Sequence, residues 1–378
     1  MSKCQSVKVT FHFLLIYAMS YELKTTDKTQ NCIYHSETEL QTLNTEPLLR
    51  VDSIKKYFPV KTGFGKPQKW LKAVDGISFE VKKDSVFAIV GESGCGKSTI
   101  ARLVLKLIPL TAGKIFFKGK DISNFSGDTL KSFRRSIQIV FQDPFASLNP
   151  RIRIVDTLSE PFKIHKIIHR SDIKDRIVHL LEKVGLNADA LNKYPHEFSG
   201  GQRQRICIAR ALTVSPELIV ADEPLSALDV SIQAQILNLL QDIKKELGIS
   251  LIFISHDLKV VHYLSDEVAV MYLGRIAEMA KTEDLFQSPK HPYTELLLAS
   301  APKIRVENNE VMGKKSKLKT LNSKLTVEGD VPSLIDISSG YMSGCPFHPR
   351  CPNRFDVCDK MVPELKNIDD RLVACHLY

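Results

Sequence analysis

The sequence predicts an α/β fold with parallel strands at its core and a small cysteine-rich segment at its C-terminus. First, a β-branched run, Val86–Val90, leads through a glycine-rich loop into a helical pattern over Ser98–Ile108. Strand, glycine loop and helix in this order are typical of a βαβ unit. Second, two apolar runs, Leu218–Ala221 and Leu251–Ser255, have the composition of buried parallel strands. Third, cysteines and prolines crowd the chain after residue 340.

The composition is that of an ordinary water-soluble protein. Of the 378 residues, 43% are hydrophobic and 25% are charged, and this length suffices for two or three domains. A net charge of +9 would suit a nucleic acid or an anionic membrane. The charge is spread along the chain apart from a lysine-rich cluster at 314–319, which favours a solvated surface.

Residues 1–45 are predicted to be a poorly ordered extension. Their apolar stretch, Phe11–Met19, is interrupted by His12 and covers about half of a bilayer crossing. It is similar to the hydrophobic region of a signal peptide, but no clear small-residue cleavage site follows. The alternative is that translation starts at Met19.

The globular pattern begins with two strands, Leu48–Ile54 and Ala73–Val81, which flank a basic loop containing Gly63 and Gly65. Residues 143–215 are predicted to be mostly helical, with an amphipathic helix over Asp172–Val184.

A further helix, Ser231–Leu247, is closed by Gly248. The polar, lysine-rich stretch after Ala299 reads as a linker. These patterns predict four parts: 1–45, a main domain over 46–300 with its helical part at about 143–215, a linker over 301–339, and a cysteine-rich region over 340–378.

The glycine-rich loop matches the phosphate-loop pattern G-x-x-x-x-G-K-[ST] in full. Its residues are Gly91, Glu92, Ser93, Gly94, Cys95, Gly96, Lys97, Ser98 and Thr99. Glycines let the backbone wrap a phosphate, Lys97 bridges phosphate oxygens, and Ser98 offers its hydroxyl to Mg²⁺. A chance glycine-rich turn would lack the strand before it and the helix after it.

Two acidic residues close the run Leu218–Ala221. Asp222 is predicted to hold Mg²⁺ through water, and Glu223 to polarise the attacking water. A strand that ends in two acids is often only a solvated turn, but the phosphate loop favours the catalytic interpretation.

The tetrad Ser199, Gly200, Gly201 and Gln202 precedes a run of helix formers. Unpaired N–H groups and the helix dipole make such a position an anion receptor. The plain alternative is that Ser199 is an ordinary N-cap.

The four C-terminal cysteines, Cys345, Cys351, Cys358 and Cys375, supply soft ligands in a segment with little hydrophobic content. Zinc and an iron–sulfur cluster both suit such a set, and a metal-free or disulfide-linked tail is the other possibility. The spacing lacks the C-x2-C pairs of common zinc ribbons.

In their order, these motifs resemble those of ATP-binding cassette (ABC) proteins over about Leu48–Ala299. The resemblance implies an ABC nucleotide-binding domain: a P-loop NTPase core with a helical subdomain and an antiparallel β-subdomain, binding ATP and Mg²⁺. The tetrad corresponds to the signature that contacts the γ-phosphate bound by another subunit. Gln142 resembles the Q-loop glutamine, which also contacts Mg²⁺. Asp229, in Ser226–Asp229, resembles the D-loop, and His256 the switch histidine.

The adenine-stacking aromatic of this family aligns with Phe58, with Tyr57 adjacent. Two departures from the family pattern are visible. Phe198 replaces the usual Leu before the signature, and Lys83-Asp84-Ser85 stands where a Gly-Glu turn is usual. Asp tolerates turn conformations, so the second departure predicts a shifted turn and unchanged chemistry.

Three segments, Ala73–Phe79, Gly91–Thr99 and Val140–Arg151, resemble oligopeptide/dipeptide importer ATPases, closest to the second, F-type member of the paired subunits. The resemblance implies a peripheral protein at the inner membrane face that works with two multi-span permeases and a sister ATPase or its own copy. An extracytoplasmic peptide-binding protein would take part indirectly. Several relatives hold a [4Fe–4S] cluster through four such cysteines. The alternatives are a related importer, such as one for nickel, and a soluble ABC ATPase acting on nucleic acid, which we do not expect.

Overall fold

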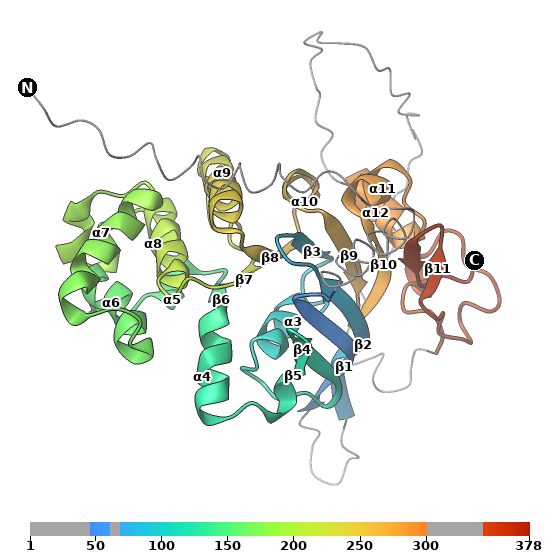
Figure 1. Cartoon of the computed structure of the whole chain (residues 1–378). Coiled ribbons are helices and arrows are strands. Elements are labelled where there is room, and N and C mark those ends of the chain that lie inside the picture. The colour runs from blue at the N-terminus through green and yellow to red at the C-terminus, as the bar shows by residue number, and fades with distance from the viewer. Residues whose placement is uncertain (1–45, 61–68, 301–342) are drawn as a thin grey trace, which may run out of the picture. The chain divides into compact units, whose positions relative to one another are not determined.

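The computed structural model describes residues 46–60, 69–300 and 343–378 (Figure 1). The described residues from Pro47 onward belong to one compact unit. The predicted N-terminal extension with Phe11–Met19, the basic loop with Gly63 and Gly65, and the predicted linker over 301–339 lie outside the described residues.

An eight-stranded mixed sheet forms the centre of this unit. In spatial order its strands are β11 (Lys366–Ile368), β12 (Arg371–Val373), β10 (Arg275–Lys281), β9 (Glu267–Tyr272), β3 (Val86–Val90), β8 (Ser250–Ser255), β7 (Leu218–Asp222) and β6 (Ile137–Val140). The neighbours from β9 to β6 run parallel, and β10, β12 and β11 add antiparallel pairs. The predicted parallel core is therefore confirmed.

A second sheet of four antiparallel strands lies beside the first in Figure 1. Its order is β2 (Lys69–Val81), β1 (Leu49–Val60), β4 (Ala112–Phe117) and β5 (Lys120–Asp121). The turn from β2 to β3 contains Asp84 at φ 57°. An Asp tolerates this left-handed conformation, as the predicted shift of the turn requires, and the unchanged chemistry stays a prediction.

The helices in the described ranges are α3 (Lys97–Val104), α4 (Gly127–Ser136), α5 (Pro144–Ser147), α6 (Ile154–His165), α7 (Ile173–Lys183), α8 (Gly200–Leu212), α9 (Val230–Leu247), α10 (Leu258–Leu264), α11 (Thr282–Gln287) and α12 (Pro292–Ser300). Short 3₁₀ turns occupy Ile122–Asn124, Arg170–Asp172, Ala188–Asn192, Pro195–Glu197 and His348–Arg350. None of the helices in these ranges is long and apolar enough to cross a bilayer.

The side chains of β3 divide between two hydrophobic cores, as the alternation of a strand requires. Val86, Ala88 and Val90 pack into a core shared with α6 to α10. Phe87 and Ile89 pack into a second core shared with α3 and the four-stranded sheet. A strand buried on both faces must be apolar throughout, which explains the continuous run Val86–Val90.

The helices predicted between 143 and 215 are present, but the helix predicted over Ser98–Ile108 ends early, at Val104. Lys106 adopts φ 51°, and its Nζ donates to the carbonyls of Ile122, Ser123 and Phe125 at 2.7–2.8 Å. The helix ends locally: the N–H groups of Lys106 and Leu107 turn back to the carbonyls of Leu103 and Arg102, and the left-handed Lys106 stops the helix.

The C-terminal segment over 343–378 packs against the rest of the unit, and its need for a metal or a disulfide stays a prediction. β12 pairs with β10 of the central sheet, and Phe347 is 1% exposed. Cys345, Cys358 and Phe347 belong to the same core as Tyr293 of α12. The segment therefore uses a core that the rest of the chain supplies.

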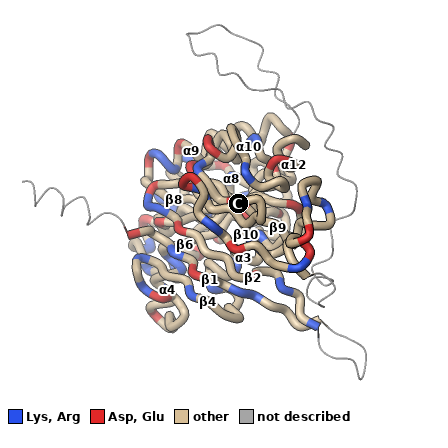
Figure 2. Tube along the Cα trace, turned by 90° about the vertical axis from the view of Figure 1, so that its right-hand side faces the viewer, with Lys and Arg blue, Asp and Glu red and all other residues tan. Residues whose placement is uncertain are grey.

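Charged residues are interspersed along the described chain. Figure 2 shows Lys and Arg alternating with Asp and Glu around α9, β1 and β4. This distribution supports the interpretation of the net charge as a solvated surface.

Candidate functional site

The phosphate loop lies between β3 and α3, and two of its glycines are required by close backbone contacts. Gly91 has φ 152°, and a Cβ there would lie 2.1 Å from the carbonyl oxygen of Met271. Gly96 has φ 107°, and its Cβ would lie 2.1 Å from the carbonyl oxygen of Ala73. Any other residue at either position would push the loop off the sheet that supports it.

Lys97 lies inside this loop with only 4% of its side chain exposed. Its Nζ donates to the carbonyl oxygens of Gly91, at 2.8 Å, and Glu92, at 3.0 Å. Ser93 and Gly94 are exposed at the tip of the loop, whereas Cys95 is buried, and burial raises the pKa of its thiol. The ammonium group is thus fixed among the loop carbonyls, where it can neutralise a bound phosphate.

Ser98 and Asp222 meet at the start of α3. Ser98 Oγ donates to Asp222 Oδ1 at 3.0 Å, and Asp222 is 6% exposed. Burial is the largest cause of a raised pKa at Asp222, with the nearby charge of Glu223 adding to it and the bond from Ser98 opposing it. The two hard oxygen atoms suit Mg²⁺, which usually takes its other ligands from water and substrate phosphates.

The carboxylate of Glu223 is the point where the predicted catalytic residues converge. Its Oε2 lies 3.2 Å from Gln142 Nε2 and 3.2 Å from His256 Nδ1, and its Oε1 lies 3.8 Å from Lys97 Nζ. The backbone of Glu223 is held at φ 46°, with its N–H donating to the carbonyl of Ile254 at 2.9 Å.

The order of the strands explains this convergence. Gln142 follows β6, Glu223 follows β7, and His256 follows β8. These are adjacent parallel strands, so their carboxyl ends meet at one edge of the sheet. In open α/β sheets, ligands bind in the crevice at this edge.

The tetrad Ser199–Gln202 begins α8 with a complete capping box. Ser199 Oγ accepts from the N–H of Gln202 at 3.3 Å, and Gln202 Oε1 accepts from the N–H of Ser199 at 3.0 Å. The N-cap interpretation is therefore correct at the level of local structure. Among the described residues, no hydrogen bond or ion pair joins the tetrad to the phosphate loop of the same chain.

The tetrad lies instead against the turn that leads into α9. A Cβ on Gly200 would meet Leu228 Cδ2 at 3.5 Å, and one on Gly201 would meet Ile232 Cγ2 at 2.5 Å. Asp229 is the exposed N-cap residue of α9. The predicted signature and D-loop residues are thus neighbours, and the D-loop begins next to Glu223, since Ser226 Oγ donates to the Glu223 carbonyl at 3.1 Å.

Of the two candidate adenine-stacking aromatics, Tyr57 has structural partners within the chain. Its hydroxyl donates to Asp75, which also pairs with Arg275, and burial is the largest cause that raises the pKa of Tyr57 to about 12. The half-buried ring of Phe58 has Lys56 Nζ 5.0 Å from its centroid. The alignment with Phe58 stays a prediction.

The four C-terminal cysteines line one small pocket together with His291, His348 and His376. All four are free thiols, and burial raises the pKa of Cys345 to about 11. In the described ranges, however, no three His, Cys, Asp or Glu side chains are grouped as a metal ion requires. The donor chemistry suits zinc or an iron–sulfur cluster, but the positions add no support, so the predicted metal site stays a prediction.

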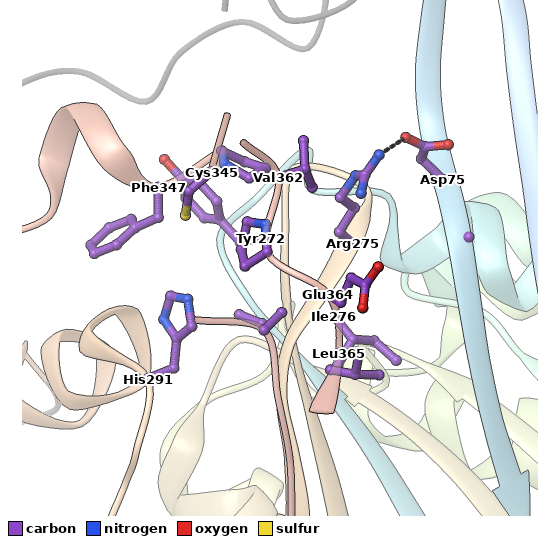
Figure 3. Close-up of a pocket in the computed structure, with 15 residues that line it drawn as sticks. Asp75, Tyr272, Arg275, Ile276, His291, Cys345, Phe347, Val362, Glu364 and Leu365 are labelled. Atoms are coloured by element: carbon purple, nitrogen blue, oxygen red, sulfur yellow. Dashed lines mark hydrogen bonds and ion pairs between the residues drawn. The ribbon is translucent and has the colours of Figure 1, made fainter. Parts of the chain in front are cut away.

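A larger cavity of about 370 Å³ is lined by residues of β2, β9, β10 and the C-terminal segment (Figure 3). Arg275 and Asp75 form an ion pair at one side of it, and Tyr272, His291 and Phe347 lie at the other. Burial lowers the pKa of His291 to about 4, so its ring is neutral.

Two further residues at the phosphate loop were not indicated by any sequence pattern. Arg350, from the C-terminal segment, pairs with the carboxylate of Glu92 at 2.9 Å. Tyr293 of α12 accepts a hydrogen bond from the N–H of Glu92 at 3.1 Å. Both are distant from the loop in sequence, and neither belongs to a motif that indicates this role.

Two known families match this chain. Residues 74–226 match the family described as ABC transporter, and residues 277–358 match the family described as oligopeptide/dipeptide transporter, C-terminal region. The second match includes part of the segment that contacts the phosphate loop.

Proteins of similar sequence span nearly the whole chain. The oligopeptide transport ATP-binding protein AppF of Bacillus subtilis is 47% identical over 338 residues, covering 89% of this chain and 98% of AppF. The dipeptide transport ATP-binding protein DppF of Escherichia coli is 42% identical over 87% of this chain and 94% of its own length. The oligopeptide transport ATP-binding protein OppF of Salmonella typhimurium is 44% identical over 87% of this chain and 95% of its own.

Solved structures share the fold. The structure of cbiO1 from Clostridium perfringens, part of an ABC transporter complex, aligns with a TM-score of 0.55 at 29% identity, covering 64% of this chain and 92% of cbiO1. An ATP-binding cassette in a dimeric post-hydrolysis state with ADP and Pi aligns with a TM-score of 0.55 at 26% identity, covering 62% of this chain and 98% of that chain.

Proposed function

The chain belongs to the ABC transporter family, in the branch of oligopeptide and dipeptide transport ATP-binding proteins, and we propose that it hydrolyses ATP to energise peptide import. The observation that carries this proposal is the convergence of Gln142, His256 and Lys97 on the carboxylate of Glu223. This arrangement brings together a general base, Glu223, two groups that orient it, and the ammonium group of Lys97, which can bind phosphate.

In the proposed reaction, water attacks the γ-phosphorus of ATP and the bond to the ADP oxygen breaks. Glu223 accepts the proton of the attacking water, and Gln142 and His256 hold the carboxylate in position through Oε2. Lys97 neutralises phosphate charge. Mg²⁺, held by Ser98 and Asp222, would supply positive charge at the phosphate oxygens. Phosphoryl transfer depends mainly on such positioning and electrostatics.

We propose that the tetrad Ser199–Gln202 and Asp229 serve a second subunit. The separation of the tetrad from the phosphate loop of its own chain supports this role. The partner would be a sister ATPase subunit, or a second copy of this chain, with two ATP molecules between them. The ring of Phe58 would stack on adenine.

The remaining partners are those that the resemblance to peptide importer ATPases implies. We propose that the pair docks on two multi-span permeases at the inner face of the membrane and that a peptide-binding protein delivers the solute on the other side. The cysteine set Cys345, Cys351, Cys358 and Cys375 is proposed to hold a [4Fe–4S] cluster. Anaerobic purification should then yield brown protein containing iron, whereas colourless protein with stoichiometric zinc would contradict the cluster.

Purification of the full chain from membranes of its own cell tests the function. We expect two multi-span proteins to co-purify with it and peptide to stimulate ATP hydrolysis by the complex. Hydrolysis stimulated by DNA or RNA in place of peptide, with no membrane protein bound, would overturn the proposal.

A further inference from the structure

We propose that Arg350 is a positioning residue of the ATP site. It holds the phosphate loop by the side chain of Glu92 and so makes nucleotide binding depend on the C-terminal segment. The inference rests on the proposed function, because it assumes that this loop binds ATP. In this proposal the C-terminal segment supports ATP binding, because it contacts the phosphate loop.

The contact is a two-pronged ion pair between residues 258 positions apart in sequence. Arg350 Nη1 donates to Glu92 Oε2 at 2.9 Å, and Nη2 donates to Glu92 Oε1 at 2.9 Å. Nη1 also donates to the hydroxyl of Tyr272 at 3.3 Å, and only Nε lacks a partner. This geometry matches a guanidinium fork to a carboxylate, which a lysine could not reproduce.

The pair is largely shielded from water. The side chain of Arg350 is 8% exposed and that of Glu92 is 23% exposed. Solvent screens such a pair much less than a surface salt bridge. Removal of the arginine would leave a carboxylate with little hydration beside the phosphate site.

An aromatic cluster holds the backbone of Glu92 as well. Tyr293 Oη accepts from the N–H of Glu92, and Tyr293 is fully buried. Its ring centroid lies 4.5 Å from that of Tyr272 and 5.3 Å from that of Phe347. Phe347 is three residues before Arg350, so the C-terminal segment contributes to both attachments of Glu92.

Glu92 transmits these contacts to Lys97. The carbonyl oxygen of Glu92 accepts a hydrogen bond from Lys97 Nζ at 3.0 Å. A shift of Glu92 therefore moves one of the acceptors that fix the ammonium group. Arg350 also neutralises the carboxylate of Glu92, which would otherwise repel the phosphates of ATP.

The experiment measures the dissociation constant for ATP with Mg²⁺ on the full chain, together with the thermal midpoint. Arg350→Gln is expected to weaken ATP binding about tenfold, within the usual range of coupling between sites. Arg354→Gln, an exposed arginine of the same segment, is the matched control and should bind ATP like the wild type.

The Glu92→Gln variant separates positioning from general stability. Glu92→Gln lacks the carboxylate that would repel ATP. Adding Arg350→Gln to Glu92→Gln should therefore weaken ATP binding less than threefold, even if the thermal midpoint falls. Equal loss of affinity in both backgrounds would overturn the inference, because the arginine would then act without Glu92.

Two further variants cover the remaining outcomes. Arg350→Lys keeps the positive charge but cannot form the two-pronged pair with Glu92, and it replaces Arg350→Gln in the test if Arg350→Gln does not fold. If folded Arg350→Lys and Glu92→Gln both bind ATP with wild-type affinity, the inference is overturned. Lys97→Ala should abolish ATP binding. If it does and Arg350→Gln binds normally, only this inference fails, whereas tight binding by Lys97→Ala would mean that the assignment of the ATP site is wrong.

Discussion

His256 Nδ1 lies 3.2 Å from Oε2 of Glu223, the same oxygen that faces Gln142 Nε2. One carboxylate oxygen thus has two orienting partners from the ends of the two neighbouring strands. The side chain of Glu223 is 14% exposed, whereas that of His256 is 60% exposed. Glu223 is therefore the enclosed residue, and His256 closes it off from the solvent side.

Glu223→Gln should bind ATP and lose hydrolysis. The amide keeps the shape of the side chain but cannot accept the proton of the attacking water. We expect the kcat of the assembled transporter to fall by about 10²–10⁴, with the dissociation constant for ATP changed less than about threefold. Glu246→Gln, on the exposed side of α9, is the control and should hydrolyse ATP normally. Robust turnover by Glu223→Gln would refute its role as the base.

His256→Ala should lower kcat without destabilising the protein. The imidazole acts through Glu223, so its loss leaves the base present but less well oriented, and a decrease of about 10–100-fold follows. Because the ring is mostly exposed, the thermal midpoint should hardly move. His262→Ala provides a comparison at a histidine with 47% side-chain exposure. A kcat equal to that of the wild type would remove His256 from the mechanism.

Gly200→Ala and Gly201→Ala should differ in stability. The methyl group at Gly201 would lie 2.5 Å from Ile232 Cγ2, a branched side chain that cannot swing away, and a loss of about 1–3 kcal/mol is expected. At Gly200 the nearest atom would be 3.5 Å away, so Ala should be neutral or stabilising by about 0.5 kcal/mol. Chemical denaturation of both variants measures the difference.

The same pair of variants tests the tetrad. If Gly200 faces a nucleotide held by a partner subunit, Gly200→Ala should reduce hydrolysis by the assembled transporter in spite of its normal stability. Full activity in Gly200→Ala would argue that the first glycine serves only the start of α8.

Asp75→Asn should lower the unfolding free energy near neutral pH but not in acid. Burial raises the pKa of Asp75, but the hydrogen bond from Tyr57 and the charge of Arg275 outweigh it and hold the pKa below its ordinary value of 3.8. The ionised carboxylate therefore stabilises the fold above that value, and this contribution disappears as the pH falls through the folded-state pKa. At pH ~6 the substitution should cost about 1–2 kcal/mol of unfolding free energy, and at an acidic pH below the folded-state pKa this cost should shrink towards zero.

Denaturation at both pH values checks this expectation. Asp242→Asn, at an exposed position on α9, should change the unfolding free energy by less than about 0.5 kcal/mol at each. A cost at Asp75 that is equally large in acid would mean that its charge does not matter.

Some elements could be predicted because short-range physics defines them. The run Val86–Val90 had to be a strand buried on both faces, and the capping box of Ser199 and Gln202 fixed the start of α8. The end of α3 at Val104 was not predicted, because Lys106, which takes the left-handed conformation that stops the helix, is an ordinary helix former. The place where the C-terminal segment packs could not be predicted, because its apolar partners on β10 and α12 are distant in sequence.

By itself the sequence determined the phosphate loop, the acids at the end of β7 and the capped start of α8, because residue order alone sets backbone sterics and hydrogen bonds between near neighbours. Only the tertiary structure decided that Gln142 and His256 contact the same oxygen of Glu223 and that Arg350 forms an ion pair with Glu92. Those contacts depend on which strands become neighbours and on which distant segment covers the last strand. The order of the strands and the position of the C-terminal segment are set by the burial of apolar side chains over the whole unit, which no local sequence pattern specifies.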